Sequence, residues 1–143
     1  MATKTLFVGA FVDTPQLGQL RIANDHALVV NDQGNIEAFL TSHEAVALSK
    51  APHIQTVQVP QGSFLVPTFC DLHLHAPQYL YLGTGLHLPL MKWLDEYAFK
   101  AEEKIDNDPN GLGHRVYSAL ANRLIQSGTG AALLFGTIRN ESK

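Results

Sequence analysis

The first 65 residues alternate between apolar and polar positions over short runs, the pattern of β-strands with one buried face. Each run ends at a turn signal, such as Asp13-Thr14-Pro15 or Asp32-Gln33-Gly34-Asn35. The pattern predicts strands at residues 6–12, 26–31, 36–40 and 54–59, with the middle two forming a hairpin. A short helix is expected between the third and fourth strands, opened by Thr41-Ser42-His43-Glu44.

The pattern changes after residue 65. Residues 69–75 read as a strand, and residues 89–105 carry apolar side chains three and four positions apart, as in an amphipathic helix. A second helix is expected from Asp108, a plausible cap, to Gly128. Residues 130–138 are almost continuously apolar, as in a strand buried on both faces. The order strand, helices, strand predicts the opening of a parallel α/β sheet.

These patterns predict two regions, a small β-rich unit at 1–65 and two β/α units at 66–143. Two parallel strands can neither close a barrel nor bury both faces of a sheet. We therefore expect the chain to be the front part of a longer protein, and to be poorly soluble or only partly ordered by itself.

Composition narrows the function classes. The chain has 143 residues, is 45% hydrophobic and has a formal net charge of −3, without a basic stripe that would predict nucleic-acid binding. The single cysteine excludes an internal disulfide and favours a reducing compartment. No apolar stretch is long enough to span a bilayer, and no signal peptide is evident at the start. The expected location is the cytoplasm, with neither nucleic acid nor membrane as a partner.

The candidate chemistry lies in the strand at 69–75. Side chains alternate along a strand, so Asp71, His73 and His75 are expected on one face and Cys70, Leu72 and Leu74 on the other. Two imidazoles and a carboxylate are costly to bury without partners, and imidazole is a good ligand for zinc or iron. Two histidines at this spacing also occur by chance, as hydrogen-bonded core or surface residues. From spacing alone the two interpretations are about equally favoured.

A longer sequence match around these residues favours the metal-site interpretation. The segment VPTFCDLHLHAPQY resembles the first barrel strand of the amidohydrolase superfamily, whose usual form is P-G, two hydrophobic residues, then D-x-H-x-H. Within that superfamily, HLHAPQY followed by LHLPLMKWLDEYAFKAEEK is similar to the guanine deaminases. The resemblance covers nearly the whole chain, but only the front part of such an enzyme.

The resemblance implies a TIM-like (β/α)₈ barrel preceded by a small β-sandwich, with both incomplete in this chain. It implies zinc held by His73 and His75, with iron as the other candidate. Asp71 would orient these ligands without binding the metal itself. Further metal ligands and the general acid/base would lie beyond Lys143, so no catalytic residue is expected here. The implied reaction is hydrolysis of guanine to xanthine and ammonia, in purine catabolism, by water activated at the metal. Members of the family often form homodimers.

The resemblance also assigns substrate contacts. Gln78 would bind guanine, because an amide both donates to and accepts from a purine edge. Trp93 and Leu90 would lie at the pocket. Core packing is the alternative for Trp93, which is on the apolar stripe of its helix, and a solvated loop position is the alternative for Gln78.

Four positions depart from the family pattern. Thr68 stands where glycine is usual, Cys70 replaces a branched aliphatic residue, and Gly130 and Ala131 stand where threonines are common. Two other interpretations stay open: another deaminase of the same superfamily, acting on a triazine, a pterin or a different purine, and a truncated product without catalysis.

Overall fold

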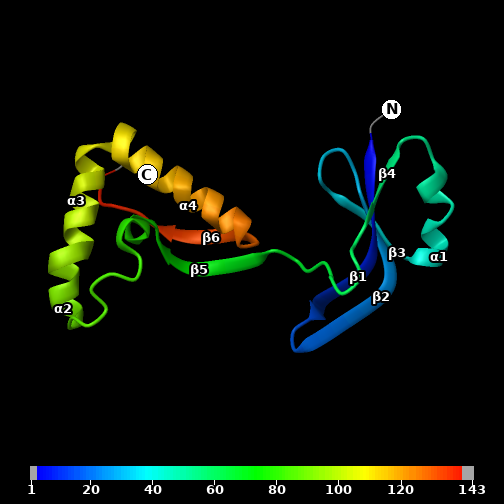
Figure 1. The fold of residues 1–143 in the computed structure, drawn as a ribbon, viewed down its shortest axis with the longest axis horizontal. Coiled ribbons are helices and arrows are strands. Elements are labelled where there is room, and N and C mark those ends of the chain that lie inside the picture. Colours follow the sequence, from blue (N-terminus) through cyan, green and yellow to red (C-terminus); the bar gives the residue numbers. More distant parts are fainter. Residues whose placement is uncertain (1–2, 140–143) are drawn as a thin grey trace. The chain divides into compact units, whose positions relative to one another are not determined.

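The chain divides into two compact units, Met1–Pro67 and Thr68–Lys143, in a computed structural model that describes residues 3–139. The division falls two residues beyond the change in sequence pattern. Figure 1 shows a β-rich unit followed by a unit of helices and two strands. The architecture is mixed α/β.

The first unit is built on one four-stranded sheet with the order β3-β2-β1-β4 (Figure 1). Its strands are β1 (Lys4–Gln16), β2 (Gln19–Val30), β3 (Ile36–Thr41) and β4 (Ile54–Gln58). The β1–β2 and β2–β3 pairs are antiparallel, whereas β4 runs parallel to β1. The predicted hairpin of the second and third strands is confirmed.

The hairpin between β1 and β2 was not predicted from the sequence. We expected the first strand to stop at Asp13, but β1 continues to Gln16, where it pairs with Gln19 across a two-residue turn. Gly18 provides the positive φ that this turn needs. Pro15 is tolerated because β4 pairs with β1 only up to Val8, so the far end of β1 has no second neighbour.

A short helix and a small core complete this unit. Helix α1 (Ser42–Ala45) begins at Thr41, whose hydroxyl accepts from the Glu44 amide while the Glu44 carboxylate accepts from the Thr41 amide. The expected helix is broken, because a separate 3₁₀ turn, η1 (Leu48–Lys50), follows α1. The core cluster consists of Leu6, Ala27, Val29 and Ala45, all buried.

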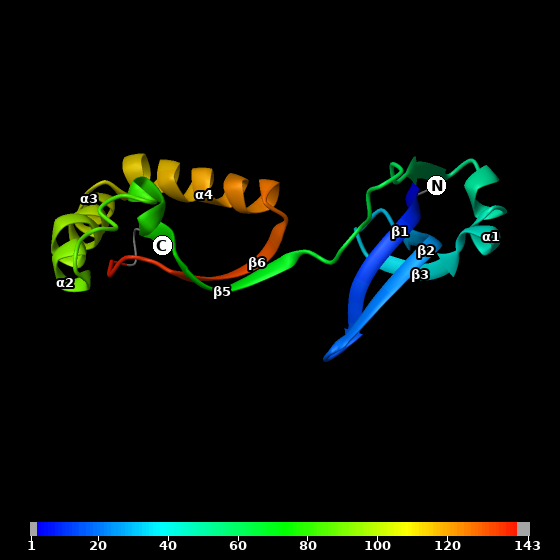
Figure 2. The same ribbon diagram turned by 60° about the horizontal axis from the view of Figure 1, so that its bottom comes forward.

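The second unit contains two parallel strands and the helices between them (Figure 2). Its elements are β5 (Phe69–His75), η2 (Ala76–Tyr81), α2 (Leu90–Trp93), η3 (Leu94–Ala98), α3 (Phe99–Asn107), η4 (Pro109–Gly113), α4 (His114–Gln126) and β6 (Thr129–Phe135). Strand β5 has the bounds that the sequence predicted. Figures 1 and 2 both show α4 running along one face of the β5–β6 pair.

The predicted helices are present with local irregularities. The first is continuous from α2 through α3 but contains a π-helical turn, η3, in its middle. The second is preceded by another π-helical turn, η4, whose amides at Gly111 and Leu112 donate to the Asp108 carboxylate. The predicted cap at Asp108 is therefore confirmed. Ile105, Val116 and Leu120 are buried, as expected of the apolar stripes.

Strand β6 differs from the expectation. Its apolar run predicted a strand buried on both faces, but Leu133, Leu134 and Phe135 are 50%, 53% and 42% exposed. It also ends at Phe135 rather than at residue 138. Within residues 68–139, β6 pairs only with β5, and the strand is exposed from Gly130 to Phe135.

Among residues 3–139, no helix is both long and apolar enough to cross a membrane.

Candidate metal and substrate site

His73 and His75 come together at the C-terminal end of β5. Their Nε2 atoms are 3.1 Å apart, and the ring centroids are separated by 5.2 Å. His73 is exposed and His75 is half-buried. When both rings are neutral, one Nε2–H donates to the other Nε2. The structure therefore brings together the two side chains that the sequence singled out.

The spacing of the two nitrogens suits a shared metal ion. Two imidazole nitrogens bound to tetrahedral zinc at 2.0–2.1 Å are about 3.3–3.4 Å apart. The 3.1 Å between the Nε2 atoms is close to this value. The pair can thus hold zinc or iron with little movement. A catalytic zinc site usually needs a third protein ligand, and no group of three or more His, Cys, Asp or Glu in residues 3–139 could hold a metal.

Asp71 lies in an irregular stretch of β5. Asp71 pairs with Ala132 and Leu74 pairs with Leu134, so β5 has one more residue than β6 between these pairs. This is a β-bulge, and it interrupts the strict alternation that placed Asp71 on the same face as both histidines. The Asp71 carboxylate accepts a hydrogen bond of 3.0 Å from the backbone amide of His73.

Phe135 belongs to the same cluster, although the sequence analysis did not single it out. It pairs with His75 in the register of β5 and β6. Its ring is stacked on His75 at 4.8 Å between centroids and lies 5.0 Å from His73. An aromatic residue at the end of the second parallel strand could have been the signal, because the ends of neighbouring parallel strands meet at one edge of the sheet.

A pocket of about 510 Å³ lies next to this cluster. Its lining comes from α4 and from the ends of β5 and β6: Ala76, Tyr117, Leu120, Ala121, Leu124, Leu134, Phe135, Gly136 and Thr137. Most of these groups are apolar, but the buried hydroxyls of Tyr117 and Thr137 have no hydrogen-bond partner. The second unit is therefore hollow beside the histidine pair.

Gln78 follows His75 by three positions and lies in the 3₁₀ helix η2. Ala76 and Pro77 are buried and anchor the start of this helix, while Gln78 is half-buried. The fold thus keeps Gln78 close in the chain to the histidine pair and leaves part of its side chain accessible.

Trp93 is held by the loop before its helix. The indole Nε1–H donates to the carbonyl oxygen of Thr84 at 2.9 Å, and the ring lies 5.5 Å from that of Tyr81. Gly85 passes so close that a Cβ there would be 2.5 Å from the Tyr97 ring. Trp93 therefore packs against the loop of residues 82–89, and its only hydrogen-bond donor is already used. Leu90, at the start of α2, is 68% exposed.

Tyr81, in the second unit, has a raised pKa. Burial raises the pKa of its hydroxyl, and the nearby Glu102 carboxylate raises it further. The hydroxyl is buried without a hydrogen-bond partner. Tyr81 is therefore neutral at physiological pH and serves as a packing partner for Trp93 and Tyr97.

Two of the departures from the family pattern are in contact. A Cβ at Gly130 would lie 2.6 Å from the Cβ of Thr68, which is too close for any side chain. Thr68 thus occupies the space that a threonine at position 130 would need. The exchange of a small and a larger residue leaves the beginning of β5 paired with β6, because the Phe69 amide still donates to the Gly128 carbonyl at 2.8 Å.

Cys70, predicted on the face of β5 opposite the histidines, is exposed. Leu72, on the same strand, is 71% exposed. The bulge disturbs this part of β5, and α4 covers only one face of the strand pair.

Comparison with known proteins gives a consistent picture, although no family model matches the chain. The mouse guanine deaminase is 31% identical over 140 residues, which are 96% of this chain and 30% of that protein. The guanine deaminase of Dictyostelium discoideum is 28% identical over 148 residues, again 96% of this chain and 32% of that protein.

A solved structure agrees with these sequences. The guanine deaminase from C. acetobutylicum, with guanine bound in its active site, matches 98% of this chain with a TM-score of 0.78 and 27% sequence identity. The matched part is 32% of that chain. The resemblance to guanine deaminases inferred from the sequence is confirmed, and the chain spans about 30% of the length of the relatives that it matches.

Proposed function

We propose that this chain is the N-terminal portion of a zinc-dependent guanine deaminase, which hydrolyses guanine to xanthine and ammonia. The observation that carries the proposal is the pair His73 and His75, with Nε2 atoms 3.1 Å apart, in a chain that is similar to guanine deaminases over 96% of its length. In the complete protein, we infer, the second unit opens a (β/α)₈ barrel and the first unit belongs to a β-sandwich.

In this proposal, β5 is the first barrel strand and presents two metal ligands at its C-terminal end. Active sites of such barrels lie at that end of the strands. Bound zinc lowers the pKa of its water towards about 7, which makes a nucleophile available at neutral pH. His73 and His75 would bind and orient the ion, while at least one more ligand and the proton-transferring group would come from other parts of the complete protein.

Gln78 is the proposed guanine contact in this chain. It is half-buried three positions past His75, and its amide offers both a donor and an acceptor to the purine edge. Leu90 is exposed at the start of α2 and can contact the substrate directly. Trp93 uses its indole N–H on Thr84, so its contribution is to the shape of the loop at residues 82–89 or to a stacking contact.

The proposal includes a cytoplasmic location and a homodimer of the complete protein. The unpaired, exposed Cys70 is consistent with a reducing compartment. A small-molecule purine is the only partner that the proposal requires.

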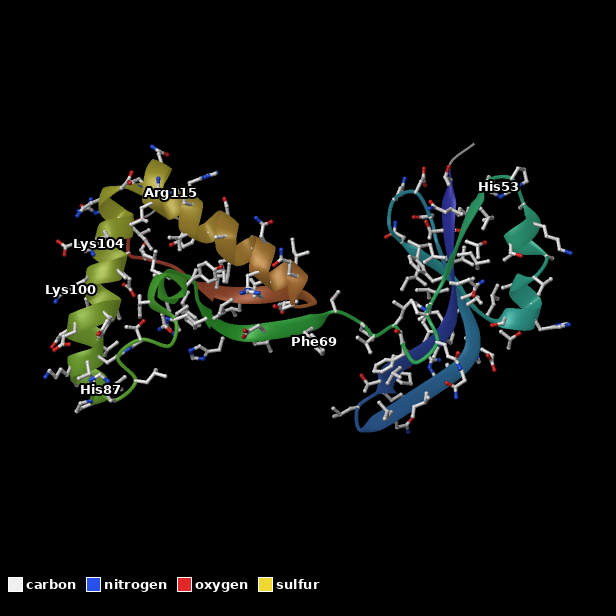
Figure 3. The ribbon with its side chains drawn as sticks, viewed as in Figure 1. His53, Phe69, His87, Lys100, Lys104 and Arg115 are labelled. Carbon is white, nitrogen blue, oxygen red and sulfur yellow. The ribbon has the colours of Figure 1, made fainter. Side chains whose placement is uncertain are left out.

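The metal assignment is tested with His73→Ala and His75→Ala in the protein that includes the sequence encoded downstream of Lys143. Each variant is expected to lose most of its zinc and its guanine turnover. His87→Ala is a matched control, because His87 is exposed in the loop beside α2 (Figure 3). Wild-type zinc content in either ligand variant, measured by atomic absorption, would refute the metal assignment.

The substrate assignment is tested with Gln78→Ala in the same protein. Removing one buried hydrogen-bond partner costs about 1–3 kcal/mol, so kcat/KM for guanine is expected to fall roughly 5- to 150-fold while zinc content stays normal. Turnover of a pterin, a triazine and other aminopurines is measured alongside. Preference for one of these over guanine would identify a different deaminase of the same superfamily.

A further inference from the structure

The carboxylate of Asp71, next to two metal-binding candidates, is bonded to the main chain of its own strand. Oδ1 accepts from the backbone amide of His73 at 3.0 Å, and among residues 3–139 Asp71 forms no ion pair. The side chain therefore acts on the main chain of its own strand rather than on a charged side chain.

This hydrogen bond lies inside the bulge of β5. Between the pairs Asp71–Ala132 and Leu74–Leu134, β5 contains Leu72 and His73 while β6 contains only Leu133. The extra residue of a bulge is left without its usual ladder partner. The Asp71 carboxylate supplies an acceptor to the His73 amide at this point of the strand.

The bulge bears directly on the geometry of the histidine pair. In a regular strand, Cα atoms two residues apart are separated by about 6.4–6.8 Å, and their side chains run roughly parallel. The Nε2 atoms of His73 and His75 are only 3.1 Å apart, so the two rings tilt towards each other. A bulge bends and twists its strand and re-aims the side chains next to it. The His73 backbone, which the bulge displaces, is the part that Asp71 holds.

We propose that Asp71 is a positioning residue: by accepting the His73 amide it fixes the bulge in β5, and the bulge sets the convergence of His73 and His75 for one metal ion. The metal in this proposal comes from the proposed function, whereas the hydrogen bond and the bulge are observed in the structure. Asparagine keeps an acceptor at the same distance along the side chain, whereas glutamate keeps the charge and is one methylene too long for the same turn. The two replacements therefore separate hydrogen-bond geometry from charge.

The first test uses the protein completed by its downstream sequence, without added metal, and a readout that needs neither metal nor activity. Amide hydrogen exchange at His73, followed by NMR, is expected to accelerate at least tenfold in Asp71→Ala and in Asp71→Glu. Asp71→Asn should stay within about threefold of the original rate. Asp95→Ala, which removes an exposed carboxylate of η3, is the control and should change nothing at His73.

The second test measures zinc affinity in the protein completed by its downstream sequence. Loss of a partner that orients a metal ligand typically lowers affinity 10- to 100-fold. This loss is expected for Asp71→Glu and Asp71→Ala, while Asp71→Asn should retain affinity within about threefold. Because glutamate is a mild replacement, the proposal stays testable even if the alanine variant does not fold.

Two results would overturn the proposal: an unchanged His73 exchange rate in Asp71→Glu, or an asparagine variant as impaired as the alanine variant. The second result would mean that the charge of Asp71 matters rather than its hydrogen bond. Failure of the proposed function would give a different result. His73→Ala would then leave zinc binding intact, while amide exchange at His73 in the Asp71 variants would still test the role of Asp71 in the bulge.

Discussion

The sheets of the two units differ in how completely they bury their apolar residues. In the first, Leu6 and Ala27 are fully buried between the sheet and α1, and three of the four strands are joined by hairpin turns or short connections. In the second, β6 is built of apolar residues but is mostly exposed. Four strands connected locally can form a small core, whereas two parallel strands need neighbours that residues 68–139 do not supply.

This difference leads us to expect that the function of the second unit depends on the rest of the protein. The histidine pair, the pocket beside it and the uncovered strand all belong to the second unit. The elements that would complete its burial are therefore expected to complete its chemistry as well. The following predictions test this contrast, from the largest expected effect to the smallest.

The same substitution should have unequal effects in the two units. Leu6→Ala removes a fully buried side chain and is expected to cost about 2–5 kcal/mol in the stability of the first unit. Leu134→Ala removes a side chain that is 53% exposed, so its cost in this chain should be about 1 kcal/mol or less. Hydrogen–deuterium exchange of peptides from each unit measures both effects.

In the protein completed by its downstream sequence, the cost of Leu134→Ala should rise into the range of Leu6→Ala, because further elements would cover β6. Equal costs in the 143-residue chain would remove the contrast between the units. An unchanged small cost in the complete protein would contradict the proposed barrel.

The contact between Thr68 and Gly130 should show strong coupling. Gly130→Thr alone forces a side chain against Thr68 and is expected to destabilise the second unit by about 1–3 kcal/mol. Thr68→Gly combined with Gly130→Thr should recover most of this loss, since it restores one large and one small residue. A double-mutant cycle on the unfolding free energy measures the coupling. Additive effects would show that the two departures are independent.

The two units should respond to opposite extremes of pH. A hydrogen bond from Arg21 lowers the pKa of Asp13, one from Lys4 lowers the pKa of Glu37, and the Thr41 amide lowers the pKa of Glu44. Below about pH 4 the unfolded chain binds more protons than the folded one, so the first unit should lose stability as the pH falls.

For Tyr81 in the second unit the sign is reversed. Its pKa is raised by burial, so the folded state holds the proton more tightly and stability is lost above about pH 10. Both effects should be small, because the groups are largely exposed. Exchange protection of each unit across the pH range measures them, and loss of both units at the same extreme would contradict the assignment.

Much of the fold could be predicted from periodicity. Strand β5 was predicted with its observed bounds, and the cap at Asp108 was predicted correctly, because both depend on local sequence. The extension of β1 past Pro15 was missed, since its tolerance depends on which strands happen to lie alongside. The exposure of β6 was missed because an apolar run predicts a buried strand, whereas actual burial depends on which other elements pack against that strand.

The site was predicted in part. The spacing of His73 and His75 predicted that both lie on one face of β5, and the structure brings their nitrogens within 3.1 Å. The bulge at Asp71 and the ring of Phe135 could not be predicted, because both depend on the register between β5 and β6. Register is set by the pairing of distant segments, and no local pattern in the sequence reports it.

The central claim is that this chain supplies two metal ligands of a guanine-hydrolysing site and needs the remaining groups from elsewhere. The most direct test is the release of ammonia from guanine, with zinc present, by the purified 143-residue chain alone and by the same chain completed with its downstream sequence. We expect release only from the completed protein, and its loss when His73 and His75 are both replaced by alanine. Zinc-dependent release by the chain alone, or release that survives loss of both histidines, would contradict the account.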